Sequence, residues 1–356
     1  MNCVIVKSLQ KFCMNHRTCI VHIGTHKTGT SALQKALTAG DFCKAGYFFP
    51  TKGRLTNDGG HHAAAMEMYK PDYPTGHITA LLEELSVSSL NAIISSEEFT
   101  SAIFYNPGIF NSFLESLDQI FDDIIIICYI RRQEKFLQSN YIERLKSKFS
   151  FTFKDYVLSR LTQNLEEYPL DYTWLTERLE KLEKLAKIRL RSYDGLTKSV
   201  IRDFQEVLHL PAAFSMADMR VNETTCLVDA MKKFVTAQLD RKLSQSEEIV
   251  LDLIGYPISA MHPQMDPSNQ MMIRNHFSSS NKKIAEKWDL PGLVDTTPLS
   301  EDNLSLEDVF SHLLSTIVPV LADRMQKEFD AREEAQKLAW ERLDIISALE
   351  KNTPPS

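Results

Sequence analysis

Residues 19–37 read CIVHIGTHKTGTSALQKAL, and the pattern of this stretch decides the fold. It begins with an apolar run typical of a strand, breaks at Gly24 and Gly29, and then places apolar residues at Leu33 and Leu37, one helical turn apart. We therefore expect a strand, a glycine-containing loop and a helix. Such a loop directs backbone N–H groups and a helix N-terminus at an anion.

The rest of the chain alternates between strand and helix patterns. Strands are predicted at GYFFP (46–50), in the apolar part of NAIISSEEFT (91–100), at IIIICYI (124–130) and in IRLRSYDG (188–195). Helices are predicted at 62–69, 78–85, 109–117, 133–149, 170–186, 199–211, 221–254 and 304–351. This alternation predicts an α/β fold: a P-loop-like parallel sheet flanked by helices, with extra C-terminal helices.

In a parallel sheet, ligands bind beyond the carboxyl ends of the strands. Several predicted strands end in polar residues, which would therefore meet at this edge. These residues are His26, Lys27, Glu97, Glu98 and Arg131.

Charge and composition narrow the classes of partner. The 356 residues carry a net charge of -7, so bulk electrostatics favours neither nucleic acid nor an anionic membrane. The longest strongly apolar run, residues 124–130, is far shorter than the roughly 20 residues of a spanning helix. Residues 1–17 show no leader pattern, so we expect a cytoplasmic protein without an integral membrane segment. The six cysteines form no CxxC pair, and neither a disulfide framework nor a zinc site is expected.

The order of residues in the loop indicates which anion it holds. Nucleotide triphosphatases of the P-loop class need Lys directly after the second glycine, followed by Ser or Thr that binds magnesium. Here Thr30 and Ser31 follow Gly29, and the lysine, Lys27, lies inside the loop. The strand 124–130 then delivers Arg131 where an aspartate would hold the metal. This pattern predicts a site without a metal and a transferred group less charged than a γ-phosphate, such as a sulfuryl group.

Two motifs resemble those of sulfotransferases that use 3′-phosphoadenosine 5′-phosphosulfate (PAPS). THKTGTSALQ (25–34) is similar to their 5′-phosphosulfate loop, P-K-[ST]-G-T-[TS], with His26 in place of the proline. YIRRQEKFLQS (129–139) is similar to their 3′-phosphate motif, in which a serine follows an arginine by eight residues, as Ser139 follows Arg131. Weaker similarities run from Cys19 to Trp288, and the C-terminal RKGxxGDWKN segment of cytosolic members is absent. The resemblance is therefore to a bacterial, carbohydrate-type sulfotransferase.

The resemblance implies a role for each matching residue. Lys27 would stabilise the leaving group, and Glu97 would accept the proton of the attacking hydroxyl. Arg131 and Ser139 would hold the 3′-phosphate, and Tyr193 would pack on the adenine. The predicted cofactor-binding residues are His26, Lys27, Thr28, Gly29, Thr30, Ser31, Arg131, Ser139 and Tyr193. The expected donor is PAPS, and the expected acceptor is a glycan or another small molecule.

The general base stays open at this point. Glu98 is next to Glu97, and neighbouring residues on a strand point to opposite sides, so the pattern does not choose between them. His61 and His62 follow the NDGG turn and are also candidates, either as base or as a substrate contact.

The expected domains are an N-terminal segment (1–17), a sulfotransferase-like α/β domain with helical insertions (18–295) and a helical tail (296–356). The tail would dock on the domain or on a second subunit, and the second case gives a homo-oligomer. Arg189 and Arg191 share one side of a strand and form either a basic pocket or a solvated face. Two alternative functions remain: a P-loop kinase or nucleotide triphosphatase, and a catalytically silent nucleotide-binding module.

Overall fold

The structure, a computed structural model, describes residues 16–39, 45–55, 59–144, 153–162, 168–209 and 265–294, together with single positions at 232, 235, 236, 242, 248, 323, 327, 334 and 337. By packing, the chain divides into two compact units. The first consists of residues 1–140, 156–224 and 267–301 and holds every candidate site residue. The second consists of residues 141–155, 225–266 and 302–356. The domain boundaries at 17/18 and 295/296 stay predictions.

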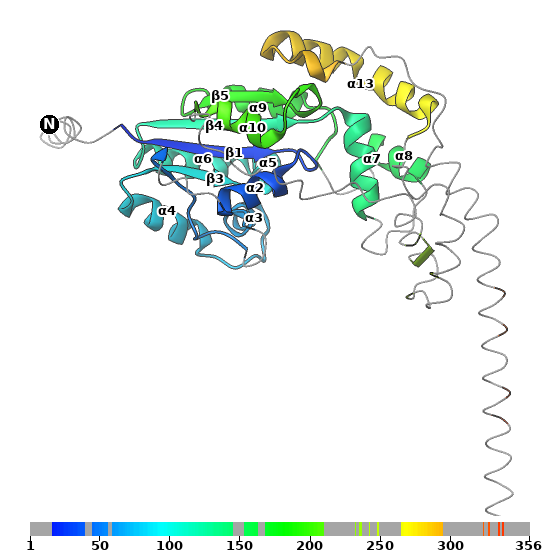
Figure 1. Cartoon of the computed structure of the whole chain (residues 1–356), viewed down its shortest axis with the longest axis horizontal. Helices are drawn as coiled ribbons and strands as arrows, with labels where there is room; N and C mark the ends of the chain where they lie inside the picture. The colour runs from blue at the N-terminus through cyan, green and yellow to red at the C-terminus, as the bar shows by residue number, and fades with distance from the viewer. Residues whose placement is uncertain are drawn as a thin grey trace, which may run out of the picture. The chain divides into compact units, whose positions relative to one another are not determined.

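The described part of the first unit is built on a sheet of five parallel strands, ordered β2-β3-β1-β4-β5. Four of them, β3, β1, β4 and β5, are labelled in Figure 1. The strands are β1 (Thr18–Gly24), β2 (Tyr47–Phe48), β3 (Asn91–Ser95), β4 (Asp123–Ile130) and β5 (Lys187–Ser192). The predicted parallel α/β sheet is confirmed. Because all five strands run the same way, their carboxyl ends meet at one edge.

Helices connect the strands. They are α2 (Thr30–Ala39), α3 (His62–Tyr69), α4 (His77–Val87), α5 (Glu98–Tyr105), α6 (Pro107–Asp118), α7 (Gln133–Arg144), α8 (Phe153–Leu161), α9 (Thr173–Leu182), α10 (Val200–Val207) and α13 (Pro267–Trp288). No described helix has both the length and the hydrophobicity of a membrane span. The helices predicted at 221–254 and 304–351 lie outside the described residues, apart from the single positions given above.

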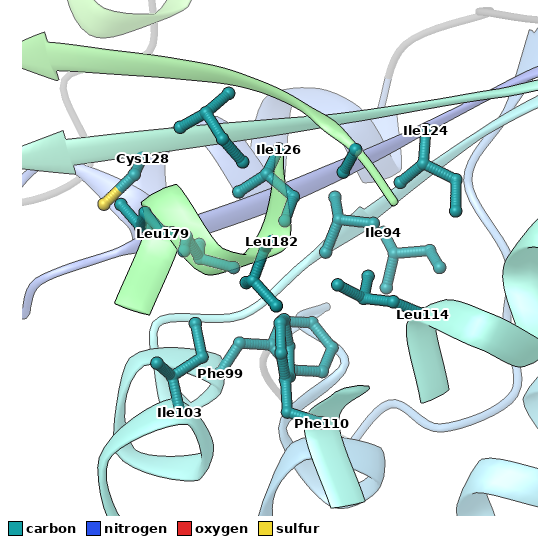
Figure 2. Packing of buried hydrophobic residues seen from close by; sticks show 14 of the residues in the cluster. Ile94, Phe99, Ile103, Phe110, Leu114, Ile124, Ile126, Cys128, Leu179 and Leu182 are labelled. Carbon is teal, nitrogen blue, oxygen red and sulfur yellow. The ribbon is translucent and has the colours of Figure 1, made fainter. Parts of the chain in front are cut away.

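Both faces of the sheet are covered, as the near-continuous apolar strands predict. Because successive strand residues point to opposite faces, each strand contributes to two cores. On one face, α2 and α10 supply Leu33, Leu37 and Phe204 to a core with Ile20, Ile93 and Ile127. On the other face, α5, α6 and α9 pack on β3 and β4. Figure 2 shows this second core, with Phe99, Phe110, Leu114, Leu179 and Leu182 beside Ile94, Ile126 and Cys128.

One expectation about the segment after β3 is wrong. Glu97 and Glu98 were expected to lie on the strand itself, at its end. Instead β3 ends at Ser95, Glu97 is the residue before the first helical residue, and α5 begins at Glu98. The physical reason is local, because Ser96 Oγ accepts a hydrogen bond from the Glu98 N–H (3.1 Å) and so satisfies an N–H at the start of the helix.

Candidate functional site

The glycine loop, residues 24–29, connects β1 to α2 through two left-handed backbone positions. Lys27 has φ of 67° and Gly29 has φ of 77°. A Cβ at Gly29 would lie 2.9 Å from Val200 Cγ1 and 3.2 Å from Tyr193 Cε2, so only glycine fits this position without displacement. A positive φ is strained for any residue with a side chain, so the backbone at Lys27 is strained. Such strain is concentrated at functional sites.

The loop leaves several backbone donors available. In the part of the chain that the structure describes, the N–H groups of Thr28, Gly29, Thr30 and Ser31 have no hydrogen-bond acceptor. Thr28 Oγ1 donates to the carbonyl of Thr25 (2.7 Å), which closes the loop from within. Unpaired N–H groups at a helix N-terminus attract an anion. The loop can therefore bind a phosphate or a sulfate group.

His26 is turned toward Tyr168, which precedes α9. The two rings stack with their centroids 6.2 Å apart, and the His26 N–H lies 3.4 Å from the Tyr168 hydroxyl. This aromatic contact fixes the position of His26 in the loop. His26 is the residue that stands where the motif has a proline.

Arg131, at the end of β4, is joined directly to the loop. Its Nη1 donates to the carbonyl of Lys27 (3.1 Å) and to Ser139 Oγ (2.8 Å). Its side chain is 19% exposed, so the guanidinium is shielded yet reachable. Residues separated by about a hundred positions in the sequence, and predicted to bind one nucleotide, thus lie in one site.

Two residues after β5, Tyr193 and Asp194, also contact Arg131. The Arg131 guanidinium lies 5.2 Å from the centre of the Tyr193 ring, and Arg131 Nε donates to Asp194 Oδ1 (3.3 Å). Asp194 also accepts from the Arg132 N–H (2.8 Å). Tyr193 therefore adjoins both Gly29 and Arg131. The sequence predicted Tyr193, but it gave no sign that Asp194 would fix the orientation of the arginine.

The carboxylate of Glu97 is oriented by two neighbours. Gln34 Nε2, from α2, lies 3.3 Å from Glu97 Oε2, and His62 Nε2, from α3, lies 3.7 Å from the same oxygen. Gln34 is buried, a polar side chain on the apolar face of its helix, and this was the available signal that it has a role. Because Gln34 belongs to the helix that follows the glycine loop, it connects the loop to Glu97.

Ser96 links His62 to the start of α5. Its Oγ accepts a hydrogen bond from the Glu98 N–H and lies 2.7 Å from His62 Nδ1. His62 Nε2 is the ring nitrogen that faces Glu97.

Gly60 makes this arrangement sterically feasible. A Cβ at Gly60 would lie 2.5 Å from His62 Nε2 and 2.6 Å from Gln34 Nε2. The backbone before α3 therefore packs directly on the two side chains that contact Glu97.

The other candidate bases have different surroundings. Glu98 Oε2 accepts a hydrogen bond from the Tyr69 hydroxyl (2.5 Å), and burial raises the pKa of Tyr69. His61 is fully buried: its Nδ1 accepts from the Ser95 N–H (3.1 Å), and its Nε2 lies 3.2 Å from the carbonyl of Pro50. Burial lowers the pKa of His61 to about 3. With both ring nitrogens engaged, His61 holds the backbone together and is not placed to accept a substrate proton.

Arg189 and Arg191 do not form a shared basic pocket. They lie on the same side of β5, where Arg191 forms an ion pair with Asp203 of α10 and Arg189 is exposed. The sequence left open a basic pocket or a solvent-exposed face for these two arginines, and the structure agrees with the exposed face. Among the described residues, no group of three or more His, Cys, Asp or Glu side chains is arranged to hold a metal ion.

Two solved structures resemble this chain weakly. No protein-family model and no curated protein matches the chain. Among solved structures, a sulfotransferase from Alicyclobacillus acidocaldarius has 15% identity and a TM-score of 0.39, over 64% of this chain and 98% of that one. The mouse sulfotransferase SULT7A1 complexed with PAP has 12% identity and a TM-score of 0.35, over 80% of this chain and 89% of that one.

Proposed function

We propose that this chain is a PAPS-dependent sulfotransferase that transfers a sulfuryl group to a hydroxyl or amine of a glycan or another small molecule. The observation that carries the proposal is the position of Arg131, whose Nη1 contacts both the carbonyl of Lys27 in the glycine loop and Ser139 Oγ. The two motifs that would hold the two ends of one nucleotide thus adjoin each other.

The residues of the site fit this donor. Four N–H groups of the loop and its helix have no acceptor among the described residues, which suits the 5′-phosphosulfate. A guanidinium beside a serine hydroxyl suits a terminal phosphate, because arginine donates several hydrogen bonds in a plane. We assign the 5′-phosphosulfate to residues 27–31 and the 3′-phosphate to Arg131 and Ser139. Tyr193, which adjoins Gly29 and Arg131, would contact the nucleoside.

PAPS supplies an activated sulfuryl group when it is bound. In the proposed reaction, Glu97 accepts the proton of the acceptor at a carboxylate oxygen, while Gln34 and His62 hold Oε2 in place. The loop N–H groups and Lys27 stabilise negative charge on the leaving oxygen. These roles require no metal.

Ligand-dependent unfolding tests the donor class. We expect adenosine 3′,5′-bisphosphate to raise the melting temperature more than adenosine 5′-monophosphate or ATP with magnesium, because a ligand bound only by the folded state stabilises it. Arg131→Ala should weaken bisphosphate binding about 10- to 100-fold, the size expected for a lost hydrogen bond to a charged group. Arg189→Ala, an exposed arginine on the same sheet, is the matched control and should leave binding unchanged.

Other outcomes would favour the two alternative functions. A magnesium-dependent preference for ATP, with transfer of its γ-phosphate, would support a kinase or nucleotide triphosphatase. Bisphosphate binding without transfer of labelled sulfate from PAPS to any of a panel of hydroxyl and amine acceptors would support a silent binding module.

A further inference from the structure

Lys135 is a cation beside this site to which neither sequence motif gives a role. It lies in the first turn of α7, four residues before Ser139, so the two side chains project from the same face of the helix. Ser139 Oγ in turn lies 2.8 Å from Arg131 Nη1. Lys135 is half-buried, and within the described part of the chain its ammonium group has neither a hydrogen bond nor an ion pair.

The charges that act on Lys135 belong to the residues around Arg131. Burial lowers the pKa of Lys135, the positive charges of Arg132 and Arg131 also lower it, and the carboxylates of Glu134 and Asp194 oppose this effect. A partly desolvated ammonium close to other cations is unfavourable on its own, and a bound anion would relieve that cost.

The two carboxylates near Lys135, those of Asp194 and Glu134, interact with arginine residues instead. Asp194 accepts from Arg131 Nε (3.3 Å) and from the Arg132 N–H (2.8 Å). Glu134 is contacted by Arg274 Nε of α13 at 3.3 Å and by Arg132 Nε at 3.5 Å. Neither carboxylate forms an ion pair with Lys135, which therefore remains available to an external anion.

We propose that Lys135 is a third contact of the nucleotide's terminal phosphate, beside Arg131 and Ser139, and that it contributes to the selection of a 3′-phosphorylated nucleotide over one that lacks this group. The inference rests on the proposed function. A phosphate dianion suits this position, because the Arg131 guanidinium is already shared with Asp194 and a second positive charge is needed to balance two negative ones.

Calorimetric binding of two nucleotides tests the inference without any activity measurement. Dissociation constants for adenosine 3′,5′-bisphosphate and adenosine 5′-monophosphate are measured for the wild type, Lys135→Met and Lys184→Met. Methionine keeps the length of the side chain, and the exposed Lys184 is the matched control. We expect Lys135→Met to weaken bisphosphate binding about tenfold and monophosphate binding less than twofold. Its bisphosphate affinity should also depend less on salt than that of the wild type.

Each outcome has a distinct meaning. If the wild type prefers the bisphosphate and Lys135→Met retains the whole preference, the role of Lys135 is refuted and the proposed function stands. If the wild type does not distinguish the two nucleotides, the proposed function fails, and this inference fails with it. Thermal unfolding without ligand shows whether the variant is folded. Should the methionine variant not fold, Lys135→Gln, which removes the charge and keeps a polar end, takes its place in the same comparison.

Discussion

Glu97 and Glu98 are neighbours in the chain, yet their carboxylates contact different groups. Glu97 Oε2 lies near Gln34 Nε2 and His62 Nε2, which orient it and leave Oε1 for a substrate. The Glu98 carboxylate accepts a hydrogen bond from the Tyr69 hydroxyl. At the scale of single residues, the geometry therefore favours Glu97 as the base, a choice that the strand pattern left open.

A pair of amide substitutions tests this choice. Glu97→Gln removes the proton acceptor and keeps the shape of the side chain, so we expect the rate of sulfate transfer to fall about 10²- to 10⁴-fold, the range for a general base. Bisphosphate affinity should change less than about twofold, because Glu97 lies outside the proposed phosphate contacts. Labelled-sulfate transfer from PAPS and calorimetry measure the two effects.

Glu98→Gln is the matched control, with an expected loss of transfer below about tenfold, because Glu98 contacts Tyr69 and not the proposed acceptor. A larger loss in Glu98→Gln than in Glu97→Gln would reverse the assignment. Equal transfer rates in the wild type and both variants would show that neither carboxylate takes part in the reaction.

At the scale of elements, the turn before α3 and the helix α2 meet at Gly60. A Cβ there would overlap the ends of Gln34 and His62, which are side-chain atoms that can move, and no backbone atom is among its closest contacts. The fold should therefore tolerate a small side chain at this position, whereas the orientation of Glu97 should not.

Gly60→Ala tests whether the orientation of Glu97 can be disturbed while the protein stays folded. We expect the free energy of unfolding to fall by about 1–3 kcal/mol, the range for an added group that displaces packed side chains, with the protein still folded. The kcat of sulfate transfer should fall about tenfold with little change in bisphosphate affinity, because Gln34 and His62 are displaced from Glu97. Gly108→Ala is the control, since a Cβ at Gly108 meets nothing closer than 3.9 Å. Unchanged kcat in Gly60→Ala would show that the two contacts do not position the base.

The sequence predicts most elements of the sheet region but not how side chains meet between them. Periodicity located β1, β4, α3 and α10 because each has a regular apolar pattern. It missed α5 because EEFTS begins with charged residues directly after a strand, and the hydrogen bond from Glu98 N–H to Ser96 Oγ that starts the helix is not visible in a pattern.

At the scale of the whole molecule, the strand order β2-β3-β1-β4-β5 brings the ends of β1, β3 and β4 side by side. The alternation of strands and helices predicted a parallel sheet and a common edge, but not this order. Arg131 and Ser139 were predicted because they belong to one motif. Gln34 and Asp194 were not, because their hydrogen bonds to Glu97 and Arg131 join pairs of elements that only the folded chain brings together.

Two buried histidines should make the stability of the whole molecule depend on pH. His22 of β1 and His61 are fully buried, and burial lowers the pKa of each to about 3. In the unfolded chain, each imidazole has its ordinary pKa of about 6.5. Above pH 6.5 both states are neutral, and the full stability is present. As the pH falls from 6.5 toward 3, only the unfolded chain takes up protons, so the free energy of unfolding decreases.

The decrease should be large enough to measure by denaturant unfolding. Between pH 6.5 and pH 5, before most carboxylates take up protons, each histidine contributes a loss of about 2 kcal/mol. His22→Gln and His61→Gln should each be less stable than the wild type at pH 7, yet each should lose less stability between pH 7 and pH 5, because glutamine does not titrate. His276→Gln, at an exposed position, should keep the wild-type dependence. If the variants at His22 and His61 also kept it, the two imidazoles would have to take up protons in the folded state, and their neutral, buried character would be refuted.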